Sequence, residues 1–516
     1  MYRFIRLILF CATIFCGIAG ANAEYAFEVG GELNLGAGSS DFAPLYLRAD
    51  RHGKVTQSKN VQFDIWASDP LDLSKRFDFS WGLEVVGGYA NKADYRRWNA
   101  ELNTFEPNMQ GPAPIWIQQL YGEVKWRSLF LRVGLKDFGS CFVDQRLSSG
   151  DLIWSGNSRG IPEVRAGFVD FQNIPFTKGW VQIDACISYG KFMDTKWVNN
   201  HFDYWEGKRN PGGFWTYKRG ALRTKPSKPF SFQAGFQMAG IFGGKSFRYR
   251  NGVLETISNN YTGVKDFFQM FLPIWGSETE GYRVGDAKGS WDAAARYRFK
   301  NGETVRAYFQ WPWEDSTGID KRNGFDGLWG LEFKMNRRWW VNGAVVEYLD
   351  LTHMAGPIAY DPQYQPDATL PYKVDGADGY YNNYYYRSYV NYGLNMGTPM
   401  VMGILFNTGY EPHNLNNDQI QRARVRGIHV AIEGAIGPDC DYIVKYSHRK
   451  AWGMTNTYAL IYPGEADSFM AEASYRLHRV PGLTLKAAVG VDHGNLPGNA
   501  AGGMLTISYE RPILFK

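Results

Sequence analysis

The sequence predicts an all-β fold, a transmembrane outer-membrane β-barrel of about eighteen antiparallel strands, with sixteen as the alternative. Three observations predict it. Apolar and polar residues alternate with a period of two, the alternating segments are about 9–12 residues long, and short and long connections alternate along the chain. The composition agrees, because 16% aromatic residues and 58 glycines in 516 residues suit bent strands and an aromatic girdle at the membrane surface.

The composition also excludes other classes of protein. A mean hydropathy of -0.37 with 21% charged residues argues against a bundle of membrane helices. No stretch after residue 23 has the ~18 uncharged apolar residues of a spanning helix. A hydrophobic content of 44% excludes a disordered chain. The formal net charge of +5 is too small and too evenly spread to indicate nucleic acid as a partner.

Residues 1–23 have the pattern of a secretory signal. Two arginines precede an uncharged, mostly apolar run over 7–20, and Ala21-Asn22-Ala23 then places small residues where signal peptidase reads them. The apolar run is short for a membrane anchor and ends in a cleavage site. We therefore expect cleavage between Ala23 and Glu24.

The remainder of the chain divides at residue 76. Residues 24–76 show no sustained helical period, and we expect them to form further β-structure at the periplasmic mouth or additional barrel strands. Residues 77–516 are expected to form the transmembrane barrel. The predicted location is the outer membrane of a Gram-negative bacterium.

The segment 77–85 illustrates the alternation. One face carries Phe77, Phe79, Trp81, Leu83 and Val85, and the other carries Asp78, Ser80, Gly82 and Glu84. A soluble sandwich would bury the apolar face, whereas an outer-membrane barrel turns it toward lipid and lines its lumen with the polar face. The connections favour the barrel, because periplasmic turns are short and outer loops are long.

Short and long connections follow one another along the chain. Tight links occur at Arg127-Ser128, Asn301-Gly302, Arg337-Arg338, Gly437-Pro438-Asp439 and Val480-Pro481-Gly482. Long connections lie near 90–113, 137–161, 191–214, 242–287, 351–383 and 450–466. We expect strands near 77–89, 115–126, 129–136, 162–171, 179–190, 215–224, 229–241, 288–299, 304–313, 326–336, 339–350, 425–436, 441–449, 467–478, 483–493 and 503–514.

The direction of the strands constrains their number. If every tight turn is periplasmic, 339–350 runs outward and 425–436 runs inward, so the region between them holds no strand or two. The segments 384–394 and 400–406 supply two, which brings the total to eighteen.

No sequence motif for catalysis or metal binding is found, and no cofactor is expected. The eight histidines are isolated and lack ligand spacing. His429, on the expected lumen face, is interpreted as a hydrogen-bonded lumen histidine, since no neighbour in the sequence would activate it. The cysteines after the signal, Cys141, Cys186 and Cys440, lie far apart and are expected as isolated thiols.

Aromatic residues lie among polar ones in the expected outer loops. Sugars present apolar C–H faces that stack on aromatic rings, and hydroxyls that pair with Asn, Asp and Arg. These loops therefore suit a polysaccharide, and for each single residue an aromatic girdle with well-packed loops is the alternative explanation. The candidate carbohydrate-binding residues are Trp197, Tyr204, Trp205, Trp313, Tyr380, Tyr381, Asn382, Asn383, Tyr384, Tyr386 and Arg387.

An ordered set of short motifs covers most of the chain from about Leu147 onward. The motifs are Leu147-Ser148-Ser149-Gly150, Trp154-Ser155-Gly156-Asn157-Ser158-Arg159-Gly160-Ile161-Pro162, Tyr189-Gly190-Lys191-Phe192-Met193-Asp194, Trp311-Pro312-Trp313-Glu314-Asp315, Asn323-Gly324-Phe325-Asp326-Gly327-Leu328-Trp329-Gly330, Tyr380-Tyr381-Asn382-Asn383 and Gly397-Thr398-Pro399. In their order and spacing the sequence resembles the capsule assembly Wzi family, in the form seen in Bacteroides-like bacteria.

The resemblance implies an outer-membrane barrel of about eighteen strands that acts as a lectin for capsular polysaccharide or exopolysaccharide and helps to hold it on the cell surface, without enzymatic activity. It also implies outer-membrane lipid and the barrel-assembly machinery as partners. Two features depart from the family pattern. Family members from enteric bacteria begin with a periplasmic helical bundle, which 24–76 lacks, and the last strand ends Leu514-Phe515-Lys516 rather than on a terminal aromatic residue.

Two other functions stay open. In a porin or substrate-specific channel the lumen would be aqueous, and Arg296, Arg298, Arg306 and Lys486 would favour anionic solutes. A long loop such as 242–287 that folds inward would close that lumen, which favours the lectin. An outer-membrane hydrolase is the third class, and the lack of catalytic motifs argues against it.

Overall fold

The computed structural model describes most of the chain beyond residue 24. The described residues are 25–99, 101–202, 208–250, 253–260, 262–271, 285–314, 319, 323–354, 379–383, 386–409, 419–453 and 463–515. The expected signal and its cleavage site at Ala23 and Glu24 lie outside these residues.

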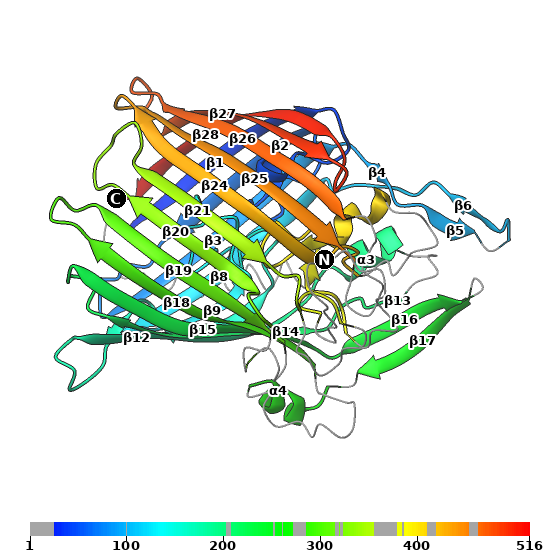
Figure 1. Ribbon diagram of the computed structural model, residues 1–516, viewed down its shortest axis with the longest axis horizontal. Coiled ribbons are helices and arrows are strands. Elements are labelled where there is room, and N and C mark those ends of the chain that lie inside the picture. The colour runs from blue at the N-terminus through cyan, green and yellow to red at the C-terminus, as the bar shows by residue number, and fades with distance from the viewer. Residues whose placement is uncertain are drawn as a thin grey trace.

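Eighteen antiparallel strands form the wall of one closed barrel (Figure 1). They are β1 (Tyr25–Gly38), β2 (Asn60–Asp69), β3 (Phe77–Ala90), β8 (Ile115–Trp126), β9 (Leu129–Leu135), β10 (Glu163–Phe168), β12 (Val181–Lys191), β14 (Phe214–Thr224), β15 (Phe230–Phe242), β18 (Asp286–Arg298), β19 (Thr304–Trp313), β20 (Gly327–Lys334), β21 (Gly343–Asp350), β24 (Arg424–Ile436), β25 (Cys440–Trp452), β26 (Gly464–Arg476), β27 (Leu483–Gly494) and β28 (Ala500–Phe515). The short β11 (Gln172–Asn173) pairs with β12 beyond the end of β10.

The barrel closes where the first and last strands meet. β1 pairs with β28 from Tyr25 opposite Phe515 to Gly38 opposite Gly502, and its other edge pairs with β2. A closed sheet leaves no strand edge exposed to lipid, where an unpaired backbone N–H or C=O costs several kcal/mol. The pairing of the two chain ends therefore completes the wall.

The side chains of the wall alternate as the sequence predicts. In β2, Val61 and Ile65 are 51% and 60% exposed, while Gln62 and Asp64 are 5% and 1% exposed. In β3, Ser80 and Glu84 are likewise buried on the lumen side. The apolar face is the outer one and the polar face lines the lumen, so the predicted fold class is confirmed.

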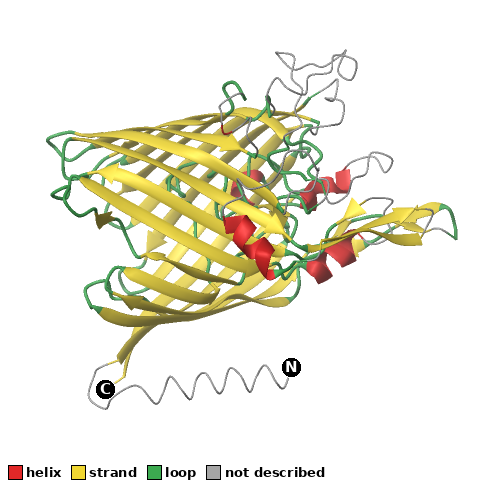
Figure 2. Ribbon diagram, turned by 90° about the horizontal axis from the view of Figure 1, so that it is seen from below, coloured by secondary structure: helices red, strands yellow, loops and turns green. Residues whose placement is uncertain are grey.

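Short turns gather at one end of the barrel and long connections at the other (Figures 1 and 2). The short-turn end is the periplasmic end, since outer-membrane barrels have short periplasmic turns. The outer end carries β4 (Ala93–Asp94), β5 (Arg97–Asn99), β6 (Thr104–Glu106), β7 (Met109–Gln110), α3 (Thr195–Phe202), β13 (Lys208–Arg209), β16 (Gly244–Arg250), β17 (Val253–Asn260) and α4 (Val264–Phe271). Among the described helices, none is long and apolar enough to span a membrane.

The predicted number of strands is confirmed, but two of the expected strands were wrong. The segments 384–394 and 400–406 give no wall strand in their described parts. They hold only the two-residue strands β22 (Val390–Asn391) and β23 (Leu394–Asn395), and η2 (Ile404–Gly409) begins in 400–406. Consecutive residues there are buried, whereas a wall strand needs every second residue to face lipid. The two missing strands are β1 and β2, from residues 24–76.

Three chain segments fold into the lumen and form a plug. We define the plug as residues 41–58, which contain α2 (Leu45–Arg48), residues 137–162, and the described part of 379–409. Its buried apolar residues form one hydrophobic core with lumen-facing residues of the wall. Leu45, Leu147, Trp154, Tyr389 and Met396 are among the core members. The described part of 242–287 does not supply the plug, and β16 and β17 extend beyond the wall instead (Figure 1).

Hydrogen bonds join the plug to the wall. The backbone N–H of Leu45 donates to Asp492 Oδ2 at 2.9 Å, and the backbone N–H of Ser149 donates to Glu347 Oε2 at 2.6 Å. His429 on β24 lies between two plug segments, with Nδ1 2.7 Å from the Tyr46 hydroxyl and Nε2 2.7 Å from a backbone carbonyl. Polar groups of the lumen face therefore hold the plug in one position.

A buried ion pair holds the third plug segment against an outer loop. Arg387 donates from Nη1 to Asp194 Oδ1 at 2.8 Å and from Nη2 to Asp194 Oδ2 at 2.5 Å. The guanidinium also lies 4.0 Å from the centroid of the Phe192 ring. The side chains of Arg387 and Asp194 are 4% and 0% exposed. Each charge therefore depends on the other for compensation.

Asp194→Ala is expected to destabilise the plug by about 3–5 kcal/mol, because the Arg387 guanidinium would stay buried without its carboxylate. Urea unfolding followed by tryptophan fluorescence measures the effect, since Trp154 of the plug and Trp215 of β14 both belong to the hydrophobic core that joins plug and wall. Glu465→Ala is the control, because the Lys450–Glu465 pair is 44% and 46% exposed and should cost no more than about 1 kcal/mol. Equal urea midpoints for both variants would contradict the prediction.

Candidate functional site

Four of the eight described candidate carbohydrate-binding residues are buried in the plug. They are Tyr380, Tyr381, Asn382 and Arg387. The Tyr380 hydroxyl donates to Asp326 Oδ2 at 2.8 Å, and the Tyr381 hydroxyl donates to a backbone carbonyl at 3.0 Å. Their polar atoms are thus used inside the protein. In this conformation the four residues are too enclosed to stack on a glycan.

The remaining candidates are placed less uniformly. Trp313, at the end of β19, is buried, with its ring centroid 6.2 Å from that of Trp291. Asn383 and Tyr386 are half-buried, and Asn383 Oδ1 accepts the Tyr386 N–H at 3.0 Å. The other three candidates, Tyr204, Trp205 and Tyr384, lie outside the described residues.

Trp197 lies half-buried on α3, in the layer of outer loops. Its ring stacks on the His201 ring, with 3.9 Å between the centroids. The Tyr95 ring contacts the same His201 ring edge-on, with 4.5 Å between the centroids. Gly393 of the plug approaches Trp197 so closely that a Cβ there would lie 2.3 Å from the indole, at a φ of +78° that favours glycine. The exposed area left for a sugar on Trp197 is therefore small.

A different set of residues surrounds a small pocket at the outer rim. We call it the outer-rim pocket, and the lining residues that matter here are Lys54, Gln57, Asn60, Gln62, Tyr89 and Trp116. Its volume of about 20 Å³ has room for one small polar group. β2 begins and β3 ends at this rim, and the neighbouring Pro112 and Pro114 keep the chain extended where it enters β8.

Two aromatic side chains flank the pocket. Tyr89 is 72% exposed. Trp116 is half-buried, and its Nε1 donates to Gln118 Oε1 at 2.8 Å. The Arg159 guanidinium lies 4.0 Å from the centroid of the Trp116 ring. The contacts with Gln118 and Arg159 fix the orientation of the indole at the rim.

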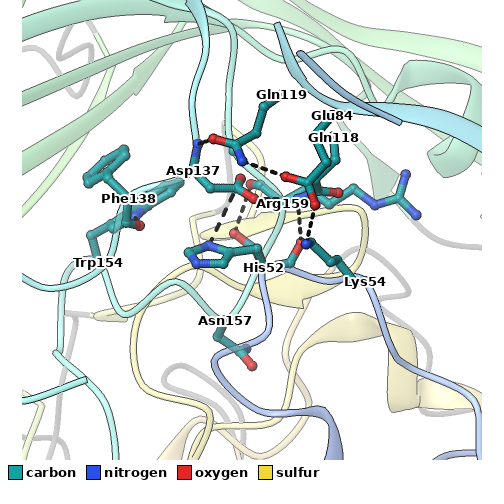
Figure 3. Close-up of polar contacts among 12 residues, drawn as sticks. His52, Lys54, Glu84, Gln118, Gln119, Asp137, Phe138, Trp154, Asn157 and Arg159 are labelled. Atoms are coloured by element: carbon teal, nitrogen blue, oxygen red, sulfur yellow. Dashed lines mark hydrogen bonds and ion pairs between the residues drawn. The ribbon is translucent and has the colours of Figure 1, made fainter. Parts of the chain in front are cut away.

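Lys54, which lines the pocket, also belongs to a polar cluster with Glu84, Gln118 and Asp137 (Figure 3). Lys54 Nζ is 3.1 Å from Asp64 Oδ2 and also forms an ion pair with Glu84. Gln118 Nε2 donates to Asp137 Oδ2 at 2.8 Å. Burial works against the charged form of Lys54, but the two carboxylates outweigh it and raise the pKa of this ammonium above its usual value. Through these contacts the cluster joins plug residues 41–58 to β2 and β3, and plug residues 137–162 to β8.

One polar atom of the pocket lacks a partner. Asn60 is 7% exposed and its Nδ2 donates to the Gln57 carbonyl at 2.9 Å. Its Oδ1 has no hydrogen-bond partner among the described residues. A buried acceptor without a partner costs about 1–3 kcal/mol, so a hydroxyl or N–H that reached this oxygen would restore a hydrogen bond.

The outer-rim pocket combines aromatic surface with amide and ammonium groups. That combination suits the binding of a polar ligand with apolar C–H faces. The described residues contain no group of three or more His, Cys, Asp or Glu side chains that could hold a metal ion. Sequence reasoning missed this site, because Lys54 and Asn60 are more than fifty residues from Trp116 along the chain. The only local signal was a tryptophan two residues after Pro114, the second proline of Pro112-Ala113-Pro114.

Neither a protein-family model nor a curated protein matches the sequence. Among solved structures, the barrel is similar to Wzi, described as an outer-membrane protein involved in group 1 capsule assembly in Escherichia coli and as a carbohydrate-binding β-barrel. The identity is 11%, the TM-score is 0.52, and the match covers 96% of this chain and 86% of that one.

Other outer-membrane barrels match less well. OccAB2 of Acinetobacter baumannii has 10% identity, a TM-score of 0.45 and coverage of 95% and 98%. OprD of Pseudomonas aeruginosa has 8% identity, a TM-score of 0.43 and coverage of 95% and 96%. At such identities a likeness shows the fold alone. The closed barrel and its apolar outer face place the chain in the outer membrane of a Gram-negative bacterium.

His201 is expected to make the packing of α3 sensitive to acid. Burial lowers the pKa of His201 to about 4, against about 6.5 in an unfolded chain. The folded state thus binds the proton less tightly, and its stability is lost as the pH falls from about 6.5 toward 4. The loss is on the order of 2 kcal/mol at about pH 5.

Hydrogen exchange of residues 195–202, corrected for the intrinsic pH dependence, measures this effect. Exchange should speed up between about pH 7 and pH 5 in the native protein and should be flatter in His201→Gln. An equal acid response in the two proteins would rule out His201 as the titrating group.

Proposed function

We propose that the protein binds a polysaccharide, of the capsular or exopolysaccharide kind, at the outer rim of the barrel and helps to retain it on the cell surface. In this proposal it is not an enzyme. The observation that carries the proposal is the outer-rim pocket, where Tyr89, Trp116 and the partnerless Asn60 Oδ1 lie together above a filled lumen.

The plug favours a binding protein over a channel. The lumen-facing Glu84, Gln237 and Arg449 are 4%, 0% and 0% exposed, as they are enclosed between wall and plug. Arg306, expected to attract anions in a channel, donates to the carbonyl of Phe142 in the plug at 2.6 Å. A solute would have to displace the plug, with its hydrogen bonds, before it could pass.

The chemistry of the rim fits a sugar. The exposed ring of Tyr89 and the indole of Trp116 offer apolar faces for C–H groups, and Asn60 Oδ1 accepts a hydroxyl. Each such contact is weak. A polymer that spans many copies of the barrel would gain affinity through multivalency.

The resemblance of the motifs to the Wzi family and the similar fold of the solved carbohydrate-binding Wzi barrel support this reading. In the same proposal, a signal peptide ending at Ala23 directs the chain to the envelope, and the barrel-assembly machinery inserts it into the outer membrane.

Trp116→Ala is expected to weaken glycan binding about tenfold, because the pocket would lose its half-buried aromatic wall. Asn60→Leu should have a similar effect through the lost acceptor. A glycan array, followed by calorimetry with the best ligand, measures both variants. Trp340→Ala, at an exposed tryptophan of a periplasmic turn, is the control and should bind normally. Normal binding by both pocket variants would refute the pocket as the site.

The channel alternative has its own test. In planar bilayers the native protein should show no large steady conductance, since the plug fills the lumen. Deletion of plug residues 44–57 should raise the conductance, which shows that the bilayer assay detects an open form of this barrel. A large steady conductance of the native protein would support the porin.

A further inference from the structure

The periplasmic end of the barrel carries a group of positive charges that the proposed function does not use. We define the periplasmic basic cluster as Lys178, Arg223, Lys225, Arg296 and Arg298. The lysines lie in the turns that follow β11 and β14, and the arginines end β14 and β18. The cluster is thus built from three wall segments that are neighbours in the sheet.

The cluster borders a pocket between the two turns. This pocket has a volume of about 380 Å³, and Lys178 and Lys225 line it together with Asn173, Gln182 and Ser227. Arg223 Nε donates to Gln182 Oε1 at 2.7 Å. The pocket opens toward the periplasm and offers ammonium, amide and hydroxyl donors.

Like charges are crowded here. Arg296 and Arg298 both donate to the carbonyl of Pro226, at 2.7 and 3.1 Å. Two guanidinium groups on one carbonyl oxygen repel each other unless an anion neutralises them. Arg223 adds a third guanidinium, held 3.9 Å from the centroid of the Phe171 ring.

Carboxylates compensate the cluster only at a distance, since Asp170 and Asp184 favour the charged form of Arg223 without pairing with it. Among the described residues, none of its five members has a carboxylate oxygen within 4.0 Å. The carboxylate of Asp184 is nearby but pairs with Arg219, and Asp170 accepts a backbone N–H at 2.6 Å.

Some cations elsewhere at the same end are paired with carboxylates. Arg338 and Arg476 lie 2.7 and 3.1 Å from the two oxygens of Asp441. Lys75 lies 3.3 Å from Asp78. The cluster thus differs from these paired cations at the same end.

The geometry points to a binding site for a phosphate group at the periplasmic mouth, formed by Arg296, Arg298 and Arg223 with Lys178 and Lys225. Guanidinium forks and ammonium groups bind phosphate oxygens with charge-assisted hydrogen bonds, and a doubly charged anion compensates crowded cations better than a single carboxylate. The site lies at the opposite end of the barrel from the outer-rim pocket, so it does not depend on the proposed glycan function.

Two sources could supply the phosphate group. One is the headgroup of an anionic lipid in the inner leaflet. The same turn presents Phe176 fully exposed and Trp180 54% exposed, as expected for side chains that enter a membrane interface. The other is free phosphate or a phosphorylated solute in the periplasm.

Two measurements on the full mature barrel separate these sources. Calorimetry in detergent with inorganic phosphate tests the free anion. Native mass spectrometry from nanodiscs that contain phosphatidylglycerol and phosphatidylcholine tests the lipid. We expect the native protein to bind at least one probe, and the binding to weaken as salt is added.

Arg296→Gln with Arg298→Gln is expected to lower the affinity for that probe about tenfold or more, through the loss of two charge-assisted contacts. Arg338→Gln with Arg476→Gln removes the same charge from paired arginines at the same end and should change the affinity less than about twofold. If the first double variant does not fold, Lys178→Gln with Lys225→Gln replaces it, since these side chains lie in turns.

Each outcome decides the proposal. Binding of phosphate alone supports a soluble ligand, and selective retention of phosphatidylglycerol supports the lipid. No binding of either probe overturns the site. Equal loss of affinity in the cluster variant and the paired-arginine control overturns it as well, because the effect would then follow net charge alone.

Discussion

The requirement that every backbone hydrogen bond be made within the sheet governs this structure. In lipid an unpaired peptide group is too costly, so the wall must close on itself, and β1 meets β28 along fourteen residue pairs. Closure fixes which face of each strand meets lipid. It also places the polar side chains of each strand in the lumen, where Gln62, Asp64 and Glu84 are buried.

A polar lumen can be solvated or filled, and here it is filled. The plug brings its own apolar core into the barrel and makes specific bonds to the wall, from Leu45 to Asp492 and from Ser149 to Glu347. Buried charges persist inside because they are paired or shared, as Arg387 is with Asp194. The lumen thus resembles the interior of a soluble domain, with a polar wall around an apolar centre.

The two ends of the barrel differ in what they offer a ligand. The outer rim has aromatic surface, and Lys54, which lines the pocket, is neutralised by Asp64 and Glu84. The periplasmic mouth has a group of cations without carboxylate partners beside exposed aromatic residues. A neutral, hydroxyl-rich ligand suits the first environment, and an anion suits the second.

The sequence by itself determined the class of fold, the lipid-facing residues and the division into short and long connections. These features follow from local alternation and turn chemistry, which a short window of residues contains. It left the segment of β1 open between a barrel strand and β-structure at the periplasmic mouth, because glycines at positions 30, 31, 36 and 38 weaken the alternation there. Only the tertiary structure decided that 389–406 belongs to the plug, that Tyr380 and Tyr381 are enclosed, and that Lys54, Asn60 and Trp116 surround one pocket. Those placements depend on contacts between residues far apart in the chain, such as Leu45 with Asp492, and no local pattern encodes which distant segments meet inside a closed wall.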